Sequence, residues 1–104
     1  MVKKVSGSTF DREVLDANVP VLVDFYSDHC APCRKMAGQL NKLDSQAKGR
    51  YKVVKVDTDA ESDLANDYQV TSLPTLIVFT RGRATKRLVG LQDNLTLMMA
   101  LGLV

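Results

Sequence analysis

Two cysteines, at positions 30 and 33, are the residues of this chain whose spacing most directly suggests chemistry. They are the only cysteines in 104 residues, and Ala31 and Pro32 separate them. A thiolate that attacks a disulfide needs a second thiol nearby to resolve the mixed disulfide that forms. This spacing at the start of a helix supplies that thiol and directs the helix N-terminus at the first sulfur. We therefore predict that Cys30 is the exposed nucleophile and Cys33 the resolving thiol.

A structural disulfide and a metal site are the other uses of such a pair. A bridge that closes so short a loop stabilises a fold by only about 2 kcal/mol on chain-entropy arithmetic. A structural zinc site draws on a second pair of ligands, whereas His29 is the only histidine and a fourth ligand would have to come from Asp28 or a second chain. Haem attachment needs a histidine directly after the second cysteine, where this chain has Arg34. The pattern therefore favours a redox pair.

The elements that must position the cysteines alternate between strand and helix character, which is typical of an α/β fold. Residues 19–26 are apolar on both faces, as in a central strand covered by helices on each side. Apolar residues then repeat at helical spacing from 33 to 47. Further strands are predicted at 2–5, 51–56, 75–80 and 84–89, the last two as an antiparallel hairpin. Further helices are predicted after Ser8 or Thr9, either of which could cap the first, and at 59–68 and 94–104.

We expect a single domain over residues 1–104, in which a central mixed β-sheet is flanked by helices on both faces. Asp24 lies on the central strand, which is otherwise apolar. A buried carboxylate is costly unless it is paired or protonated. We therefore predict that Asp24 exchanges a proton with Cys33, directly or through a water, as the mixed disulfide resolves.

Residues 24–36, DFYSDHCAPCRKM, closely resemble the active-site stretch of the thioredoxin family. Residues 54–57 (VKVD) resemble the family's middle strand and residues 71–76 (TSLPTL) its cis-proline loop, while Gly82 and Gly90 fall at its turn and loop glycines. The resemblance runs along the whole chain and implies the thioredoxin fold and the reduction of protein disulfides by dithiol–disulfide exchange. A disulfide oxidase or isomerase and a non-catalytic adaptor with this fold are the alternatives.

The resemblance also implies roles for individual residues. It supports Asp24 as the proton acceptor, makes Lys55 its partner on a neighbouring strand, and implies a cis bond at Pro74, packed beside Cys30. A free backbone at Leu73 would then pair with a substrate strand. The substrate-binding set consists of His29, Ala31, Pro32, Leu73, Pro74 and Gly90.

Three positions depart from the family's usual residues. His29 and Tyr26 stand where the family usually has tryptophan, and Ala31 stands where it usually has glycine. We expect these changes to affect partner recognition and the redox potential rather than the exchange chemistry. At pH values below about 6.5, a protonated His29 would in addition lower the pKa of Cys30.

Charge and composition bear on partners and compartment. With 14 basic and 12 acidic residues, the chain has none of the strong basic excess typical of nucleic-acid binding. It has no apolar run of the roughly 20 residues that a membrane span needs and no export signal, so we expect a cytoplasmic protein. No glycine-rich phosphate fingerprint is present, so we expect no cofactor. The resemblance implies an NADPH-dependent flavoprotein reductase as the partner that regenerates the dithiol.

Two surface features can be interpreted either as ordinary solvent-exposed surface or as binding sites. Four basic residues cluster on the predicted hairpin: Arg81, Arg83, Lys86 and Arg87. They form either a solvated turn or a docking site for an acidic partner. Residues 94–104 contain no charged side chain, so part of their apolar surface is expected to face solvent. That segment is either a harmless end or a site of self-association, which leaves a monomer or a weak dimer.

Overall fold

The computed structural model describes all 104 residues. In chain order its elements are β1 (Lys3–Lys4), the short π-helix η1 (Asp11–Leu15), β2 (Val21–Tyr26), α1 (Ala31–Ser45), β3 (Lys52–Asp57), α2 (Ser62–Asp67), β4 (Thr75–Thr80), β5 (Arg83–Val89) and α3 (Asn94–Ala100). The five strands form one sheet in the order β1-β3-β2-β4-β5. Strands β1, β3 and β2 are parallel, whereas β4 is antiparallel to β2 and β5. The predicted mixed sheet and the antiparallel hairpin are therefore confirmed.

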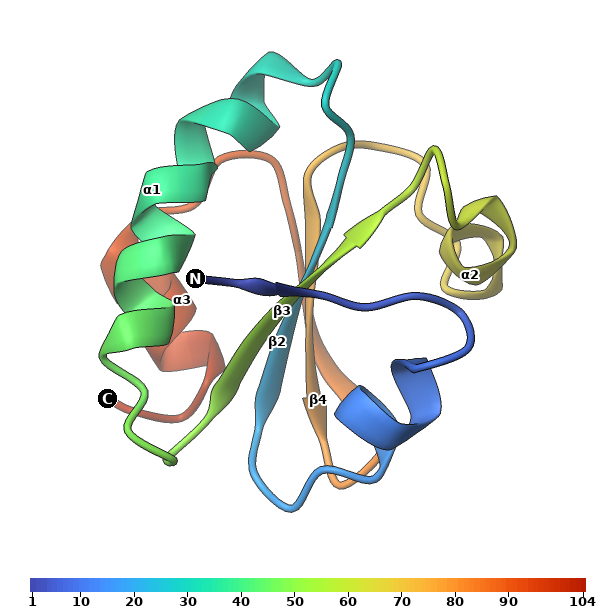
Figure 1. Cartoon of the computed structure of the whole chain (residues 1–104). Helices are drawn as coiled ribbons and strands as arrows, with labels where there is room; N and C mark the ends of the chain where they lie inside the picture. Colours follow the sequence, from blue (N-terminus) through green and yellow to red (C-terminus); the bar gives the residue numbers. More distant parts are fainter.

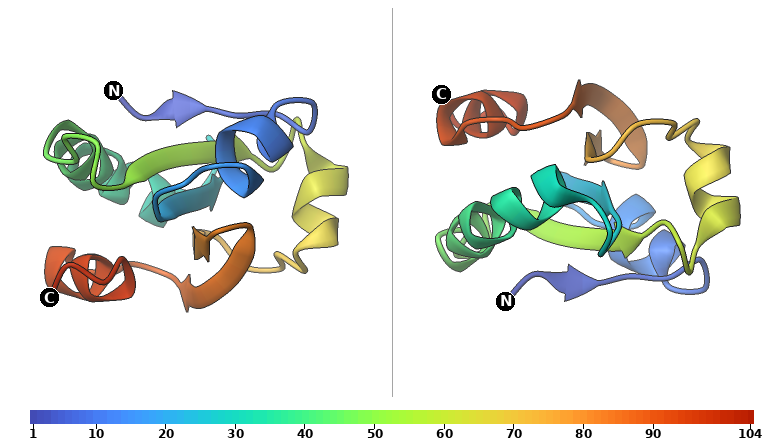
Figure 2. Two further views of the ribbon diagram at one scale, coloured as in Figure 1. Left: turned by 90° about the horizontal axis from the view of Figure 1, so that it is seen from below. Right: turned by 90° about the horizontal axis from the view of Figure 1, so that it is seen from above.

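Helices cover both faces of this sheet, as predicted. Helices α1 and α3 lie on one side, and η1 and α2 lie on the other (Figures 1 and 2). Each side has its own apolar core, one including Leu22, Met36 and Leu40 and the other including Phe10 and Phe25. None of the helices is both long and apolar enough to cross a bilayer.

Strand β2 lies at the centre and is buried along its whole length. Successive side chains of a strand point to opposite faces. Val23 and Phe25 pack in the core beneath η1, whereas Leu22 packs in the core beneath α1 and α3. By the same alternation, Asp24 and Tyr26 point toward α1. The strand thus places one carboxyl group inside the layer that carries the cysteines.

Helix α1 begins at Ala31, two residues before the predicted start, with Cys30 as its N-cap. Pro32 lies in the first turn. There its fixed φ suits a helix, and its lack of an N–H costs no hydrogen bond, because the N–H groups of the first turn have no acceptor within the helix. Pro32 is therefore part of the helix, although the helical spacing in the sequence begins only at residue 33. Strand β2 likewise begins at Val21 rather than residue 19, because Pro20 has no N–H to donate to the sheet ladder.

The other helices are shorter than predicted. Neither Ser8 nor Thr9 caps η1, since Phe10 precedes it with no side-chain cap and the Thr9 hydroxyl instead accepts a hydrogen bond from the Ser6 N–H at 2.9 Å. Helix α2 covers residues 62–67 rather than 59–68, and α3 ends at residue 100 rather than 104. After α3 the chain turns at Gly102, whose φ of +77° is a left-handed conformation that glycine adopts readily.

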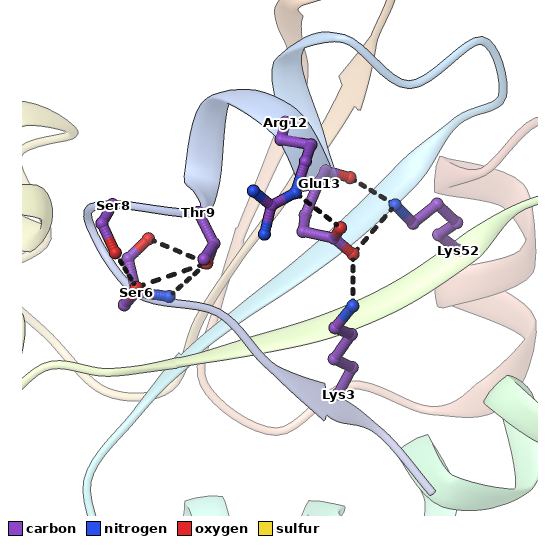
Figure 3. A network of polar contacts seen from close by, with 7 residues as sticks. All are labelled: Lys3, Ser6, Ser8, Thr9, Arg12, Glu13 and Lys52. Atoms are coloured by element: carbon purple, nitrogen blue, oxygen red, sulfur yellow. Dashed lines mark hydrogen bonds and ion pairs between the residues drawn. The ribbon is translucent and has the colours of Figure 1, made fainter.

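A cluster of charged side chains ties the N-terminal segment to the sheet on the η1 side (Figure 3). The Glu13 carboxylate forms ion pairs with Lys3 Nζ at 2.9 Å and with Lys52 Nζ at 3.6 Å. The Arg12 guanidinium lies 3.6 Å from the same carboxylate. Lys3 and Lys52 come from β1 and β3, so the cluster joins two strands to η1. Hydrogen bonding from Lys3, and then the charge of Lys52, lower the pKa of Glu13.

Candidate active site

The two cysteines lie where the central strand gives way to the long helix. Strand β2 ends at Tyr26, a short loop follows, and α1 starts directly after Cys30. Cys30 and Cys33 form a disulfide whose Cα atoms are 5.2 Å apart, a normal separation for a bridge. The backbone N–H of Cys33 donates to Cys30 Sγ at 3.2 Å. An otherwise unpaired N–H of the first helical turn thus points at the first sulfur, as the sequence predicts.

The two sulfurs differ in their access to solvent. Cys33 is only 5% exposed, whereas Cys30 is half-buried. A protein partner can therefore reach Cys30 much more readily than Cys33. Around Cys30, the side chains of His29, Ala31 and Pro32 are exposed, so a docking partner would meet these three residues first.

The loop between β2 and α1 is held by Ser27, which sequence analysis missed. Ser27 is buried, and its hydroxyl donates to Asp59 at 2.6 Å and accepts from the His29 N–H at 3.2 Å. Its carbonyl accepts from the Cys30 N–H at 3.2 Å. A serine directly after a strand, able to bond the backbone two residues on, is the local signal that could have identified it. Ser27 therefore fixes the approach to the nucleophile.

Asp24 is a buried acid without a hydrogen-bond partner on one oxygen. It is 5% exposed, and its Oδ1 forms no hydrogen bond. Burial raises the pKa of Asp24 to about 7, and the charge of Lys55 opposes that rise. Asp24 and Cys33 line the same pocket of about 120 Å³. Because its pKa lies near neutrality, this carboxyl group can both accept and release a proton under ordinary conditions.

Lys55 lies next to Asp24, as predicted, but the two side chains form no ion pair. Their Cα atoms are register partners in the parallel β2–β3 pair, and both residues line the pocket. None of the four ion pairs in the chain includes either residue. The Lys55 ammonium instead lies 5.3 Å from the centroid of the Tyr26 ring. Lys55 therefore acts on Asp24 through space rather than by contact.

The pocket between the sheet and α1 also includes residues that sequence analysis did not assign to the site. Asp28, Arg34 and Asn41 are among them, and Arg34 donates to the Asp28 carbonyl at 2.8 Å. No three His, Cys, Asp or Glu side chains gather where they could hold a metal ion. The set of His29, Cys30, Cys33 and Asp28, weighed above as a metal site, does not come together as one.

The second loop of the predicted site brings Pro74 and Gly90 together. The Leu73–Pro74 bond is cis, as the resemblance implies, and the Pro74 carbonyl accepts from the Gly90 N–H at 2.8 Å. Leu73 lies outside the strands, and neither its N–H nor its C=O takes part in a hydrogen bond within the chain. This leaves one backbone donor and one acceptor for another chain. The expected contact between Pro74 and Cys30 stays a prediction.

Comparison with known proteins agrees with this geometry. The model of the thioredoxin family matches residues 1–101. The chain belongs to the thioredoxin family. It is 43% identical over 98 residues to Thioredoxin 1 of Nostoc sp., which covers 94% of this chain and 92% of that protein. It is 39% identical over 98 residues to the thioredoxin of Synechocystis sp., with the same coverage of both chains.

A third relative is longer. The bifunctional thioredoxin reductase/thioredoxin of Mycobacterium leprae is 37% identical over 95 residues, which cover 91% of this chain and 21% of that protein.

Family membership and the bridged Cys30–Cys33 pair together establish the chemistry. This member of the family is a protein-disulfide oxidoreductase that works by dithiol–disulfide exchange, as predicted. The thioredoxin fold predicted from the sequence is likewise confirmed.

Proposed function

We propose that this protein reduces the disulfides of other proteins, with Cys30 as nucleophile. The observation that carries the proposal is the half-buried Cys30 at the N-terminus of α1, paired with a buried Cys33. In the first step the Cys30 thiolate attacks one sulfur of a target disulfide. A Cys30–target disulfide forms, the target S–S bond breaks, and the target's other sulfur leaves as a thiolate.

In the second step Cys33 resolves this mixed disulfide. The Cys33 thiol gives its proton to the Asp24 carboxylate, directly or through a water, and the resulting thiolate attacks Cys30 Sγ. The Cys30–Cys33 bond forms, the mixed disulfide breaks, and the second target sulfur leaves as a thiolate. The target has then gained two electrons and the dithiol has lost two. The shared pocket and the pKa of about 7 support Asp24 in this role.

Lys55 favours the ionised form of Asp24 from the neighbouring strand. Its charge lowers the pKa of the carboxyl group against the effect of burial. Lys55 thereby keeps part of the Asp24 population able to accept a proton near neutral pH.

Substrate recognition would use the two loops described above. The free N–H and C=O of Leu73 can pair with an extended segment of the target, a mode that reads the main chain and tolerates many side chains. Pro74 and Gly90 shape that loop, and the exposed His29, Ala31 and Pro32 flank Cys30. These residues form the proposed contact surface for disulfide-containing proteins.

The oxidised pair would be returned to the dithiol by an NADPH-dependent flavoprotein reductase. The Mycobacterium leprae relative is named a bifunctional thioredoxin reductase/thioredoxin, which supports a reductase as partner. We further infer that the chain forms a single domain, is a monomer or a weak dimer, works in the cytoplasm, and serves electron transport and redox homeostasis there.

Reduction of insulin disulfides by dithiothreitol tests the direction and the roles together. We expect the protein to accelerate insulin reduction and Cys30→Ser to abolish the acceleration. Cys33→Ser should instead accumulate a mixed disulfide through Cys30. The adaptor alternative predicts no acceleration by the unmodified protein, and a mixed disulfide through Cys33 in Cys30→Ser would contradict the assignment of the nucleophile.

The redox potential separates a reductase from an oxidase or isomerase. Equilibration with glutathione and dithiothreitol buffers should place the pair at about −270 mV, the reference value for thioredoxin. A value near about −180 mV or above would favour an isomerase or an oxidase instead.

A further inference from the structure

Tyr26 lines the same pocket as the two residues that govern the proton at the site, Asp24 and Lys55. It is the last residue of β2, is 8% exposed, and lines the pocket with Asp24 and Lys55. Its side chain leaves the same face of β2 as that of Asp24, two residues earlier. By its resemblance to the family, the sequence indicates only that this position usually carries tryptophan. The contacts of the ring give it a more specific role.

The face of the Tyr26 ring binds the Lys55 ammonium in a cation–π contact. Lys55 and Asp24 are register partners, so a lysine side chain could bend toward the carboxyl group. The Lys55 nitrogen lies instead 5.3 Å from the Tyr26 ring centroid, within the range at which the face of an aromatic ring attracts a cation. Desolvation strengthens that attraction, and both side chains are largely shielded from solvent.

A second lysine also interacts with Tyr26. Lys4 of β1 is the register partner of Lys55, and its interaction with Tyr26 raises the pKa of Lys4. Lys4 and Lys55, from two neighbouring strands on the same side of β2, thus both interact with one aromatic side chain. The remaining charged groups facing this end of the pocket are Asp57 of β3, Asp28 of the loop and Arg34 of α1.

We propose that Tyr26 is a positioning residue whose ring holds the Lys55 ammonium away from Asp24 and so sets the pH at which Asp24 takes up a proton. The effect of Tyr26 on catalysis rests on the role of Asp24 given under "Proposed function". The effect of Tyr26 on the titration of Asp24 does not depend on that role. Without the ring, the flexible lysine side chain is free to reach the carboxylate next to it. An ammonium in contact would favour ionised Asp24 more strongly than one held at the ring.

The size of the effect follows from Coulomb's law. Lys55 and Asp24 form no ion pair, and at an effective dielectric constant of about 20, bringing the ammonium into contact with the carboxylate should lower the pKa of Asp24 by about one unit. Losing the ring should therefore lower the midpoint of the Asp24 titration by about one pH unit. Losing only the hydroxyl, which leaves the ring face in place, should change it little.

The experiment compares Tyr26→Phe and Tyr26→Leu, each with Lys55 intact and with Lys55→Met. The titration of the Asp24 carboxyl carbon is followed by NMR in the oxidised protein. We expect the midpoint to fall by about one unit in Tyr26→Leu, to stay unchanged in Tyr26→Phe, and to be insensitive to Tyr26→Leu once Lys55 is methionine. An equal fall with and without Lys55 would mean that the ring only excludes water, which overturns the proposal. An upward shift or no shift in Tyr26→Leu would overturn it as well.

A measurement on the unmodified protein guards against a variant that does not fold. The ε-methylene protons of Lys55 should show an upfield ring-current shift that Tyr26→Phe retains, and its absence would contradict the proposed contact. The pH profile of mixed-disulfide resolution then tests the catalytic role separately. If the Asp24 titration moves as expected while the resolution profile does not, Tyr26 positions Lys55 but Asp24 is not the proton acceptor.

Discussion

Replacing Asp24 with asparagine should stabilise the oxidised protein by an amount that grows with pH. Asp24 is 5% exposed, and one of its oxygens has no hydrogen-bond partner. Ionising Asp24 in the folded protein therefore costs free energy. The unfolded chain does not have this cost, because its carboxylate is hydrated. Asparagine keeps the shape of the side chain and cannot ionise, so it removes this cost.

The magnitude follows from the pKa of Asp24, which burial raises from 3.8 to about 7. Below about pH 4 the group is protonated in both states, and its titration contributes nothing to the pH dependence of stability. Between about pH 4 and pH 7 the unfolded chain has released its proton while the folded chain retains it, so the stability of the native protein falls by about 1.4 kcal/mol per pH unit. Above pH 7 the full difference of about 4 kcal/mol separates the two proteins.

Urea unfolding of the oxidised proteins at a series of pH values from 4 to 9 measures this difference. Urea is uncharged and leaves the electrostatic contribution unscreened. Asp67→Asn is a matched control, because Asp67 is exposed at the end of α2 and its side chain takes part in no ion pair. A stability gain for Asp24→Asn that is constant with pH, or that shrinks as pH rises, would refute the reasoning.

Three further predictions concern the scaffold and the loop. Glu13→Gln should destabilise the protein at pH 7, since Lys3 and Lys52 lower the pKa of Glu13. In urea unfolding, this loss of stability should fade as acid protonates Glu13 in the native protein, and high salt should reduce it. Phe10→Ala should cost about 3–5 kcal/mol in urea unfolding, because Phe10 is 2% exposed and packs against Tyr68 and Phe79; a loss below about 1 kcal/mol would contradict the assigned core. His29→Ala should decrease the thiolate fraction of Cys30 at mildly acidic pH, where a protonated imidazole would favour the thiolate, and thiolate absorbance of the reduced protein measures this. An unchanged thiolate titration would remove His29 from the electrostatics of the site.

The surface features raised by the sequence are placed by the structure but their roles stay predictions. All four cations of the β4–β5 hairpin are exposed and none forms an ion pair, although Arg87 donates to the Tyr68 carbonyl. On α3, Leu95 and Met99 are each 58% exposed, as the lack of charge in that segment predicts. Sedimentation at increasing protein concentration would show whether this face joins two copies.

The sequence by itself determined the chemistry of this protein and the order of its elements. The Cys-x-x-Cys spacing between an apolar strand and an amphipathic helix was sufficient to predict a redox pair, because both signals are local. Helix ends were less predictable, since they depend on individual capping contacts. Asp93, for example, caps α3 by accepting from the Thr96 N–H at 2.8 Å, and the sequence analysis did not identify it.

Only the tertiary structure decided how the charges around Asp24 are arranged. The sequence places Asp24, Tyr26, Lys55 and Lys4 on three separate strands, and strand register alone makes Lys55 a neighbour of both Asp24 and Lys4. Whether a lysine then contacts a carboxylate or an aromatic ring depends on distances of a few ångströms, to which electrostatic energies in a poorly hydrated pocket are very sensitive. No sequence pattern encodes that choice, because it follows from packing between residues far apart in the chain.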